Sequence, residues 1–205
     1  MKSLISAVAI LVAAIAGNAF ASDYWPTSGT TTYTYVSDGG YEWVVSMVDG
    51  QRDLTYASGW FRQTFSADAY GNVFLSSWTA LNTSYDIRIP YGEDYAPPLL
   101  FPTSSLAVGQ TNVSPTYATN PYGFTHLVWC RWEVVAEETV AVPAGVFDTM
   151  VVEVSCESDG LPSGRYYLSR EVGPVILPRG YRLASVNGTV PTEDTTWGSL
   201  KALFR

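Results

Sequence analysis

The chain consists of short runs of aromatic and β-branched residues, and a turn signal interrupts them about every ten residues. Asp49-Gly50 is one such signal, because Asp-Gly supplies the positive φ that tight hairpin turns need. No stretch before the C-terminal tail has a convincing helical period. This pattern predicts an all-β domain, a single curved antiparallel sheet or half-open barrel with a meander order. The runs are TTYTYV (31–36), YEWVVSMV (41–48), LTYASGWFRQTF (54–65), NVFLSSW (72–78), YDIRIP (85–90), VEVSC (152–156), RYYLSR (165–170), PVILP (174–178) and GYRLASV (180–186).

Two segments depart from the pattern. Residues 91–125 hold five prolines among many Ser, Thr and Asn, which predicts a long irregular excursion or short edge strands joined by loops. The tail, 192–205, is expected to form a turn or short helix that covers one edge of the sheet, with a docking peptide as the alternative. No linker separates two complete core patterns, so residues 22–191 are expected to form one antiparallel β domain.

Residues 1–21 have the parts of a secretory signal peptide. Lys2 is the positive start, Leu4 to Gly17 is a run of small and aliphatic residues, and Ala19-Phe20-Ala21 is a small-x-small cleavage pattern. The run is shorter than the roughly 20 residues that a membrane span needs. We therefore expect a secreted or periplasmic chain that begins near Ser22, with an uncleaved anchor as the alternative. An integral membrane protein is not expected.

Export would place the two cysteines in an oxidising compartment, where disulfides form. Cys130 and Cys156 lie in strand-like runs on either side of Val142-Pro143-Ala144-Gly145, which is a turn signal. A hairpin that opposes the cysteines is centred on Pro143 and puts apolar residues of both strands on one face. The same register sets Glu133 opposite Glu153, an unfavourable pair that a bulge or a two-residue slip would relieve. We expect a Cys130–Cys156 disulfide, and two separate buried thiols are the alternative.

Three segments carry a resemblance to a known family. The start of the mature region, Tyr24-Trp25-Pro26 followed by Gly29 to Tyr35, resembles a "Y-x-P-x-x-x-G-x-x-W-x-Y" opening. Residues 138–149 resemble a "V-x-V-P-A-G-x-F" hairpin, and residues 170–175 resemble an "x-x-G-V-G-P-V" strand start. The chain thus resembles an uncharacterised family of exported bacterial β-proteins, similar in architecture to the periplasmic lipoprotein-localisation factors. The resemblance implies a curved antiparallel sheet and suggests an apolar ligand.

The residue types present exclude several kinds of chemistry. A net charge of −8, from 11 Lys and Arg against 19 Asp and Glu, argues against a nucleic-acid partner. His126 is the single histidine, and no G-x-S-x-G motif accompanies it, so an ordinary hydrogen-bonded His is favoured over a catalytic one. One His and two paired cysteines do not make a zinc site. We expect a non-enzymatic protein without cofactor or metal. Acids such as Glu93-Asp94 leave calcium binding or a two-carboxylate glycosidase as alternatives to solvated turn residues.

Aromatic residues are frequent, with 7 Trp, 14 Tyr and 8 Phe. In a β protein such rings fill the core, line a lipid cleft or stack on sugars. Trp25, Trp43, Trp60 and Trp78 are our candidates for ligand binding. We expect a cell-envelope or secreted protein that binds a lipid or another apolar molecule on the concave side of its sheet. The alternatives are a carbohydrate-binding module, with a glycan as partner, and a structural or assembly component acting through the tail or residues 91–125.

Overall fold

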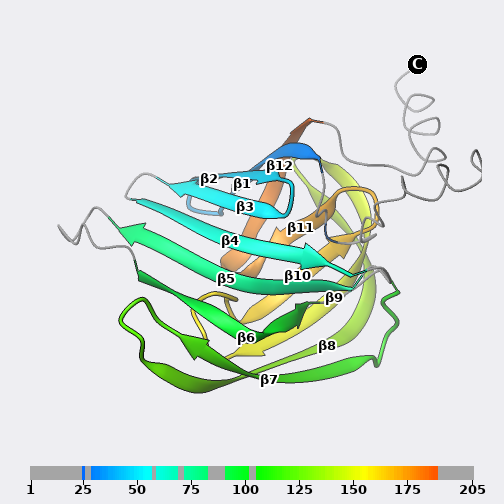
Figure 1. The fold of residues 1–205 in the computed structure, drawn as a ribbon. Coiled ribbons are helices and arrows are strands. Elements are labelled where there is room, and N and C mark those ends of the chain that lie inside the picture. The colour runs from blue at the N-terminus through cyan, green and yellow to red at the C-terminus, as the bar shows by residue number, and fades with distance from the viewer. Residues whose placement is uncertain are drawn as a thin grey trace, which may run out of the picture.

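The computed structural model describes residues 25, 29–56, 59–68, 72–82, 91–101 and 105–188. These residues form twelve strands and one short 3₁₀ turn, η1 (Pro178–Gly180) (Figure 1). The strands are β1 (Thr30–Val36), β2 (Glu42–Val48), β3 (Gln51–Tyr56), β4 (Gly59–Ala67), β5 (Val73–Asn82), β6 (Tyr91–Phe101), β7 (Thr111–Thr119), β8 (Thr125–Val142), β9 (Gly145–Cys156), β10 (Gly164–Ser169), β11 (Gly173–Leu177) and β12 (Tyr181–Gly188). The predicted signal peptide 1–21, the predicted strand 85–90 and the tail 192–205 lie outside the described residues.

Each strand pairs antiparallel with its neighbours along the chain, and β1 also pairs with β12. The sheet therefore closes into an up-and-down barrel (Figure 1). The predicted all-β fold is confirmed, and the β1–β12 pairing closes what was expected as a curved sheet or half-open barrel. Closure leaves no exposed sheet edge, which removes a template for aggregation. In the part of the chain that the structure describes, no helix is long and apolar enough to cross a membrane.

The connections of an up-and-down barrel alternate between its two ends. We call the end with residues 37–41, 157–163 and 178–180 the mouth, and the end with residues 49–50, 143–144 and 170–172 the base. Alternate residues of each strand point into the barrel, as the burial pattern of β1 shows, where Thr31, Tyr33 and Tyr35 are buried. The core is therefore enclosed by the strands rather than sandwiched between layers.

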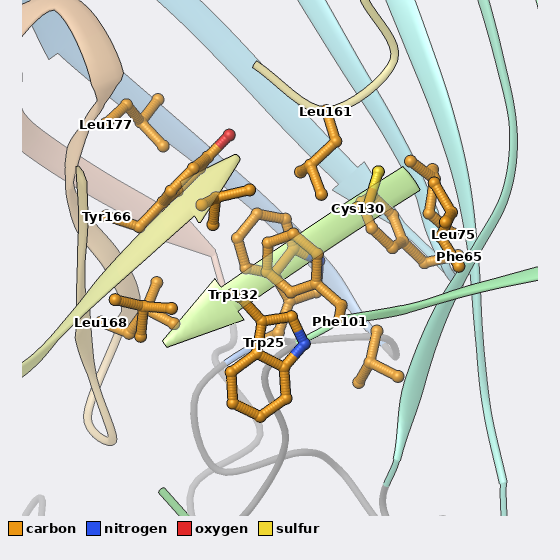
Figure 2. Packing of buried hydrophobic residues seen from close by; sticks show 14 of the residues in the cluster. Trp25, Phe65, Leu75, Phe101, Cys130, Trp132, Leu161, Tyr166, Leu168 and Leu177 are labelled. Carbon is orange, nitrogen blue, oxygen red and sulfur yellow. The ribbon is translucent and has the colours of Figure 1, made fainter. Parts of the chain in front are cut away.

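Trp25 fills the barrel interior near the base. It precedes β1, is 1% exposed, and its ring centroid lies 5.2 Å from that of Phe65 and 4.3 Å from that of Phe101 (Figure 2). Tilted ring packing of this kind buries a large apolar area and adds a small electrostatic attraction. The base is thus packed solid with aromatic side chains.

The β8–β9 hairpin has the predicted register near the cysteines. Cys130 faces Cys156, and the two form a disulfide. Trp132 and Val134 continue on the buried face, as parity requires. A bulge between Val134 and Ala136 then shifts the register by one residue, so the turn lies at Pro143-Ala144. The sequence prediction of a disulfide-linked hairpin is confirmed.

The like-charged pair of this hairpin is not relieved by a slip. Glu133 still faces Glu153, and each carboxylate has an arginine beside it. Arg131 Nη2 lies 2.7 Å from Glu133 Oε2, and Arg165 Nη2 lies 3.7 Å from Glu153 Oε2. Exposed ion pairs contribute little stability on their own. Here they offset a repulsion, which lets the cysteines keep their direct opposition.

The prediction for residues 91–125 was wrong. Most of this segment belongs to β6 and β7, and each of these strands pairs on both sides. The prolines misled because they sit where the ladder is incomplete. Pro97 and Pro98 fall in an irregular stretch of β6 that lacks pairing with β5, and Pro115 lies where β7 pairs only with β8. A proline without a ladder donor is tolerated at such positions.

Candidate functional site

A cavity of about 430 Å³ lies inside the barrel at the mouth end. Small-molecule sites in proteins typically measure about 300–1,000 Å³. Rings and aliphatic side chains make most of the wall, and four polar side chains interrupt it. The apolar wall includes Trp43, Leu54, Phe61, Trp78, Tyr166 and Leu177, and the polar residues are Arg52, Gln63, Asp159 and Arg179.

The aromatic part of the wall is ordered by ring packing. Phe61 and Trp78 are stacked with centroids 5.4 Å apart, and Trp78 meets Tyr91 edge-on at the same distance. At the other side Trp43 stacks on Tyr181 with centroids 3.5 Å apart. Such rings present rigid, flat apolar surfaces that lose little entropy on contact with a ligand. The wall suits an apolar molecule better than a heavily hydrated one.

The structure separates the four tryptophans that the sequence singled out. Trp43 and Trp78 line the cavity. Trp25 is packed at the base of the barrel, beyond the cavity. Trp60 neighbours the inward-facing Phe61, so parity turns it outward, where Arg62 lies 5.8 Å from its ring centroid. A ligand-binding role stays a prediction for all four, and the cavity is the place where two of them come together.

Four inner-face residues form a row across β3, β4, β5 and β6, because each is the register partner of the next. Arg52 pairs with Gln63, Gln63 with Trp78, and Trp78 with Glu93. Hydrogen bonds run along part of the row: Arg52 Nη1 donates to Gln63 Oε1 at 2.7 Å, and Trp78 Nε1 donates to Glu93 Oε2 at 3.0 Å. We call these four residues the polar row.

Arg52 is a buried cation without an anionic partner. It is 8% exposed, and no carboxylate of the described residues lies within ion-pair distance of it. Its charge is held by Gln63 Oε1 and by the face of Trp25, whose ring centroid lies 5.3 Å from Cζ. Burial lowers the pKa of Arg52 from its usual value, although an arginine remains protonated at physiological pH.

Sequence analysis missed Arg52 and Gln63, and strand parity held the signal. Arg52 is two residues from Leu54, and Gln63 lies midway between Phe61 and Phe65. Once those apolar residues are assigned to the inner face, both polar residues must share it. A polar residue at an inner position of a barrel is costly unless it is hydrogen-bonded, which marks these positions as candidates for function.

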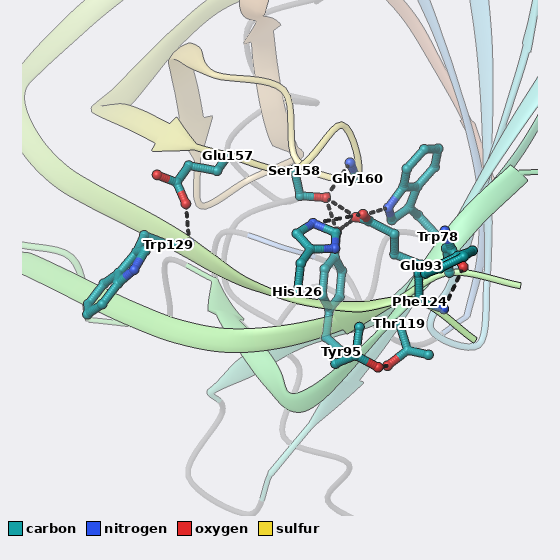
Figure 3. Close-up of polar contacts among 12 residues, drawn as sticks. Trp78, Glu93, Tyr95, Thr119, Phe124, His126, Trp129, Glu157, Ser158 and Gly160 are labelled. Carbon is teal, nitrogen blue, oxygen red and sulfur yellow. Dashed lines mark hydrogen bonds and ion pairs between the residues drawn. The ribbon is translucent and has the colours of Figure 1, made fainter. Parts of the chain in front are cut away.

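Glu93 joins five elements at the mouth (Figure 3). Its Oε2 accepts hydrogen bonds from Ser158 Oγ at 2.6 Å and from Trp78 Nε1 at 3.0 Å, and its Oε1 lies 3.4 Å from His126 Nε2. Tyr95 shares a short hydrogen bond with the same serine hydroxyl. His126 is thus hydrogen-bonding material at a strand start, as the sequence favoured, with Glu93 as its neighbour.

The order of these groups differs from that of a nucleophilic triad. In a triad the imidazole stands between the hydroxyl and the acid, so that it can take the hydroxyl proton. Here Glu93 stands between Ser158 and His126, and the serine donates directly to the carboxylate. The arrangement fastens the β9–β10 connection, residues 157–163, to the wall of the barrel.

A second tie holds the same connection from the other side. Gln63 Nε2 donates to the carbonyl oxygen of Gly160 at 2.6 Å, and the N–H of Gly160 donates to Ser158 Oγ at 3.1 Å. A Cβ at Gly160 would overlap ring atoms of Trp78 and the hydroxyl of Tyr95. The connection therefore folds into the mouth with no spare space, and it forms part of the cavity wall through Asp159 and Pro162.

Replacing Gly160 with Ala is expected to reduce the free energy of unfolding by about 1–3 kcal/mol, the usual cost of overpacking a filled interior. Urea titration followed by tryptophan fluorescence measures it, and the spectrum itself should change, because Trp78 must move. Gly39→Ala is the matched control, since the nearest atoms to its added Cβ belong to the side chain of Tyr41, which is 73% exposed. Equal stability of the two variants would contradict the tight packing at Gly160.

Two exposed rings lie outside the barrel, away from the cavity. Tyr117 on β7 and Trp129 on β8 are 56% and 47% exposed, and they are diagonal neighbours in the register of these strands. Among the described residues, no group of three or more His, Cys, Asp and Glu side chains is placed to hold a metal ion.

Comparison of the chain with known protein families, with curated proteins and with solved structures found no match. The resemblance to the exported bacterial family with the "V-x-V-P-A-G-x-F" hairpin stays a prediction. The barrel cavity, with its aromatic wall and its polar row, is the candidate functional site.

Proposed function

We propose that this protein is a secreted or periplasmic, non-enzymatic binding protein that holds a small apolar molecule in the mouth of its barrel. The observation that carries the proposal is the cavity of about 430 Å³ with its wall of stacked aromatic side chains. The predicted signal peptide and the Cys130–Cys156 disulfide support export, because disulfides persist in oxidising compartments.

The physical reason is the transfer of apolar surface out of water. Each methylene group that enters such a cavity contributes about 0.8 kcal/mol. The wall is already assembled, since ring stacking and two ties to the β9–β10 connection hold it. A site formed before binding loses less conformational entropy when the ligand arrives, so more of the transfer free energy appears as affinity.

Binding of uncharged apolar probes tests this function. Nile red, a neutral dye whose fluorescence rises in apolar surroundings, is expected to bind the wild-type protein and to be displaced by a long-chain alcohol. Ala80 is 2% exposed and lines the cavity, so Ala80→Phe should reduce the affinity for Nile red at least roughly tenfold by occupying the space. Val146→Phe changes a residue that is 67% exposed and is the matched control.

Two results would contradict the function. One is a wild-type protein that binds neither Nile red nor the alcohol. The other is an Ala80→Phe variant, folded by circular dichroism, that binds the dye as well as Val146→Phe does.

The alternatives from the sequence are less well supported. A carbohydrate-binding module would need a row of exposed, coplanar rings, and Tyr117 with Trp129 offers a pair on the outer face of the barrel. An assembly role through the tail 192–205 concerns residues outside those described. The enclosed cavity is the more specific feature, so we place the function there.

A further inference from the structure

We infer that the ligand of this cavity is an amphipathic carboxylic acid, and that Arg52 binds its carboxylate at the floor of the cavity. The inference rests on the proposed function and names the chemical class of the ligand. Arg52 is suited to this task by its position, by its unused hydrogen-bond donors and by the absence of an anion beside it.

The position of Arg52 is between two cavities. It lines the large cavity at the mouth and also a small cavity of about 10 Å³ toward the base, which Trp25, Tyr33 and Tyr35 border. Trp25 lies beneath the guanidinium, with its ring centroid 5.3 Å from Cζ. The guanidinium is therefore part of the floor, and the aromatic wall with Trp43 and Phe61 rises from it toward the mouth.

The donors of Arg52 are mostly unused. A guanidinium offers five N–H groups in a planar fork. Nη1 bonds Gln63 Oε1, and neither Nε nor Nη2 has an acceptor among the described residues. These two nitrogens are also not sealed from accessible space, unlike the buried hydroxyl of Tyr33, which has no hydrogen-bond partner. An oxygen-rich group in the cavity would meet a free edge of the fork.

Burial without an anion makes this arginine expensive to keep. Moving a charge out of water costs several kcal/mol unless a partner of opposite charge or a set of hydrogen bonds replaces the water. An arginine in a purely structural role would be expected to bond a carboxylate, as Arg62 does with Asp53 at 2.7 Å on the outer face of the same two strands. A ligand carboxylate supplies the missing partner and matches the fork in a bidentate manner.

Gln63 positions the guanidinium for this contact. Its Oε1 accepts from Arg52 Nη1, and its Nε2 donates to the carbonyl oxygen of Gly160, so its amide is held at both ends. The Nη1 end of the fork is thereby fixed against the wall of the barrel. An acid bound with its carboxylate on Arg52 would run along the aromatic wall and emerge beside Asp159 and Arg179 at the rim.

The test compares a long-chain fatty acid with the alcohol of the same chain length, each displacing Nile red at neutral pH. The wild-type protein is expected to bind the acid at least roughly tenfold more tightly than the alcohol, since hydrogen bonds to a charged group are about twice as strong as neutral ones. Arg52→Met, which keeps the apolar stem, should lose this preference and still bind the alcohol. Arg52→Lys keeps the charge without the fork and should retain only part of the preference.

Arg62→Met is the matched control, because it removes an arginine from the neighbouring strand on the outer face, where its side chain is 46% exposed. It should keep the preference for the acid. Equal binding of acid and alcohol by the wild-type protein would overturn the inference and leave the proposed function standing. Failure to bind Nile red and the alcohol would remove the proposed function as well. If Arg52→Met does not fold, the wild-type ratio and Arg52→Lys decide the question.

Discussion

Above about pH 10 the barrel is expected to lose stability steeply, by roughly 5 kcal/mol for each pH unit. The reason is a set of four tyrosines that the folded barrel keeps protonated. Burial raises the pKa of each of them above the ordinary value, and this desolvation outweighs the opposing effect of the Arg52 charge on three of them. They are Tyr33, Tyr35, Tyr95 and Tyr166, all buried.

The sign follows from the direction of the shifts. The pKa of each group is higher in the folded state, so the unfolded chain binds fewer protons once the pH exceeds the unfolded value of about 10. The stabilisation is fully present below that pH and is lost as the pH rises toward the folded values. Each tyrosine contributes about 1.4 kcal/mol per pH unit in that window, and their effects add while the barrel stays folded.

An alkaline titration checks this with two signals. Tyrosinate absorbance reports ionisation, and tryptophan fluorescence reports unfolding of a core that contains Trp25 and Trp132. The ionisation of the buried tyrosines should coincide with the loss of native fluorescence. Tyr33→Phe removes a hydroxyl without a hydrogen-bond partner and should raise the midpoint, whereas Tyr41→Phe, on the surface, should not. Full tyrosinate absorbance in a protein with native fluorescence would refute the prediction.

The sequence predicted the fold well where local rules act alone. The register around Cys130 and Cys156 follows from parity and from the turn signal near Pro143, because an antiparallel hairpin is a local structure. Residues 91–125 were misjudged because proline was weighed without its neighbours. Whether a proline such as Pro115 is tolerated depends on which side of the strand is paired, and that is fixed by the closed barrel as a whole.

The candidate site was harder to predict, since it is assembled from distant segments. Aromatic content pointed to a binding role, yet Trp43 and Trp78 differ from Trp25 and Trp60 only in where parity and position in the barrel place them. The polar row was invisible because register partners on four strands are 11 to 15 residues apart in sequence. Glu93 and Ser158 meet only because the β9–β10 connection folds into the mouth.

Loss of the disulfide is expected to reduce the free energy of unfolding by about 3–4 kcal/mol. Cys130 and Cys156 are 26 residues apart, and a cross-link over a loop of that length removes about this much conformational entropy from the unfolded chain. The double variant Cys130→Ala/Cys156→Ala should show the loss in urea titrations. Reduction of the wild-type protein by a thiol should show a loss of the same size, without any change of side chain.

The disulfide should also matter for the site, because it clamps the hairpin just before the residues that enter the mouth. Cys156 is two residues from Ser158, and its N–H donates to Ser163 Oγ at 2.9 Å, at the far side of the same connection. Without the cross-link, residues 157–163 should open more often and the affinity for Nile red should fall. Thiol should have no further effect on the double variant, which serves as the control. Unchanged urea midpoints in both the reduced protein and the double variant would show that the barrel alone holds this hairpin in place.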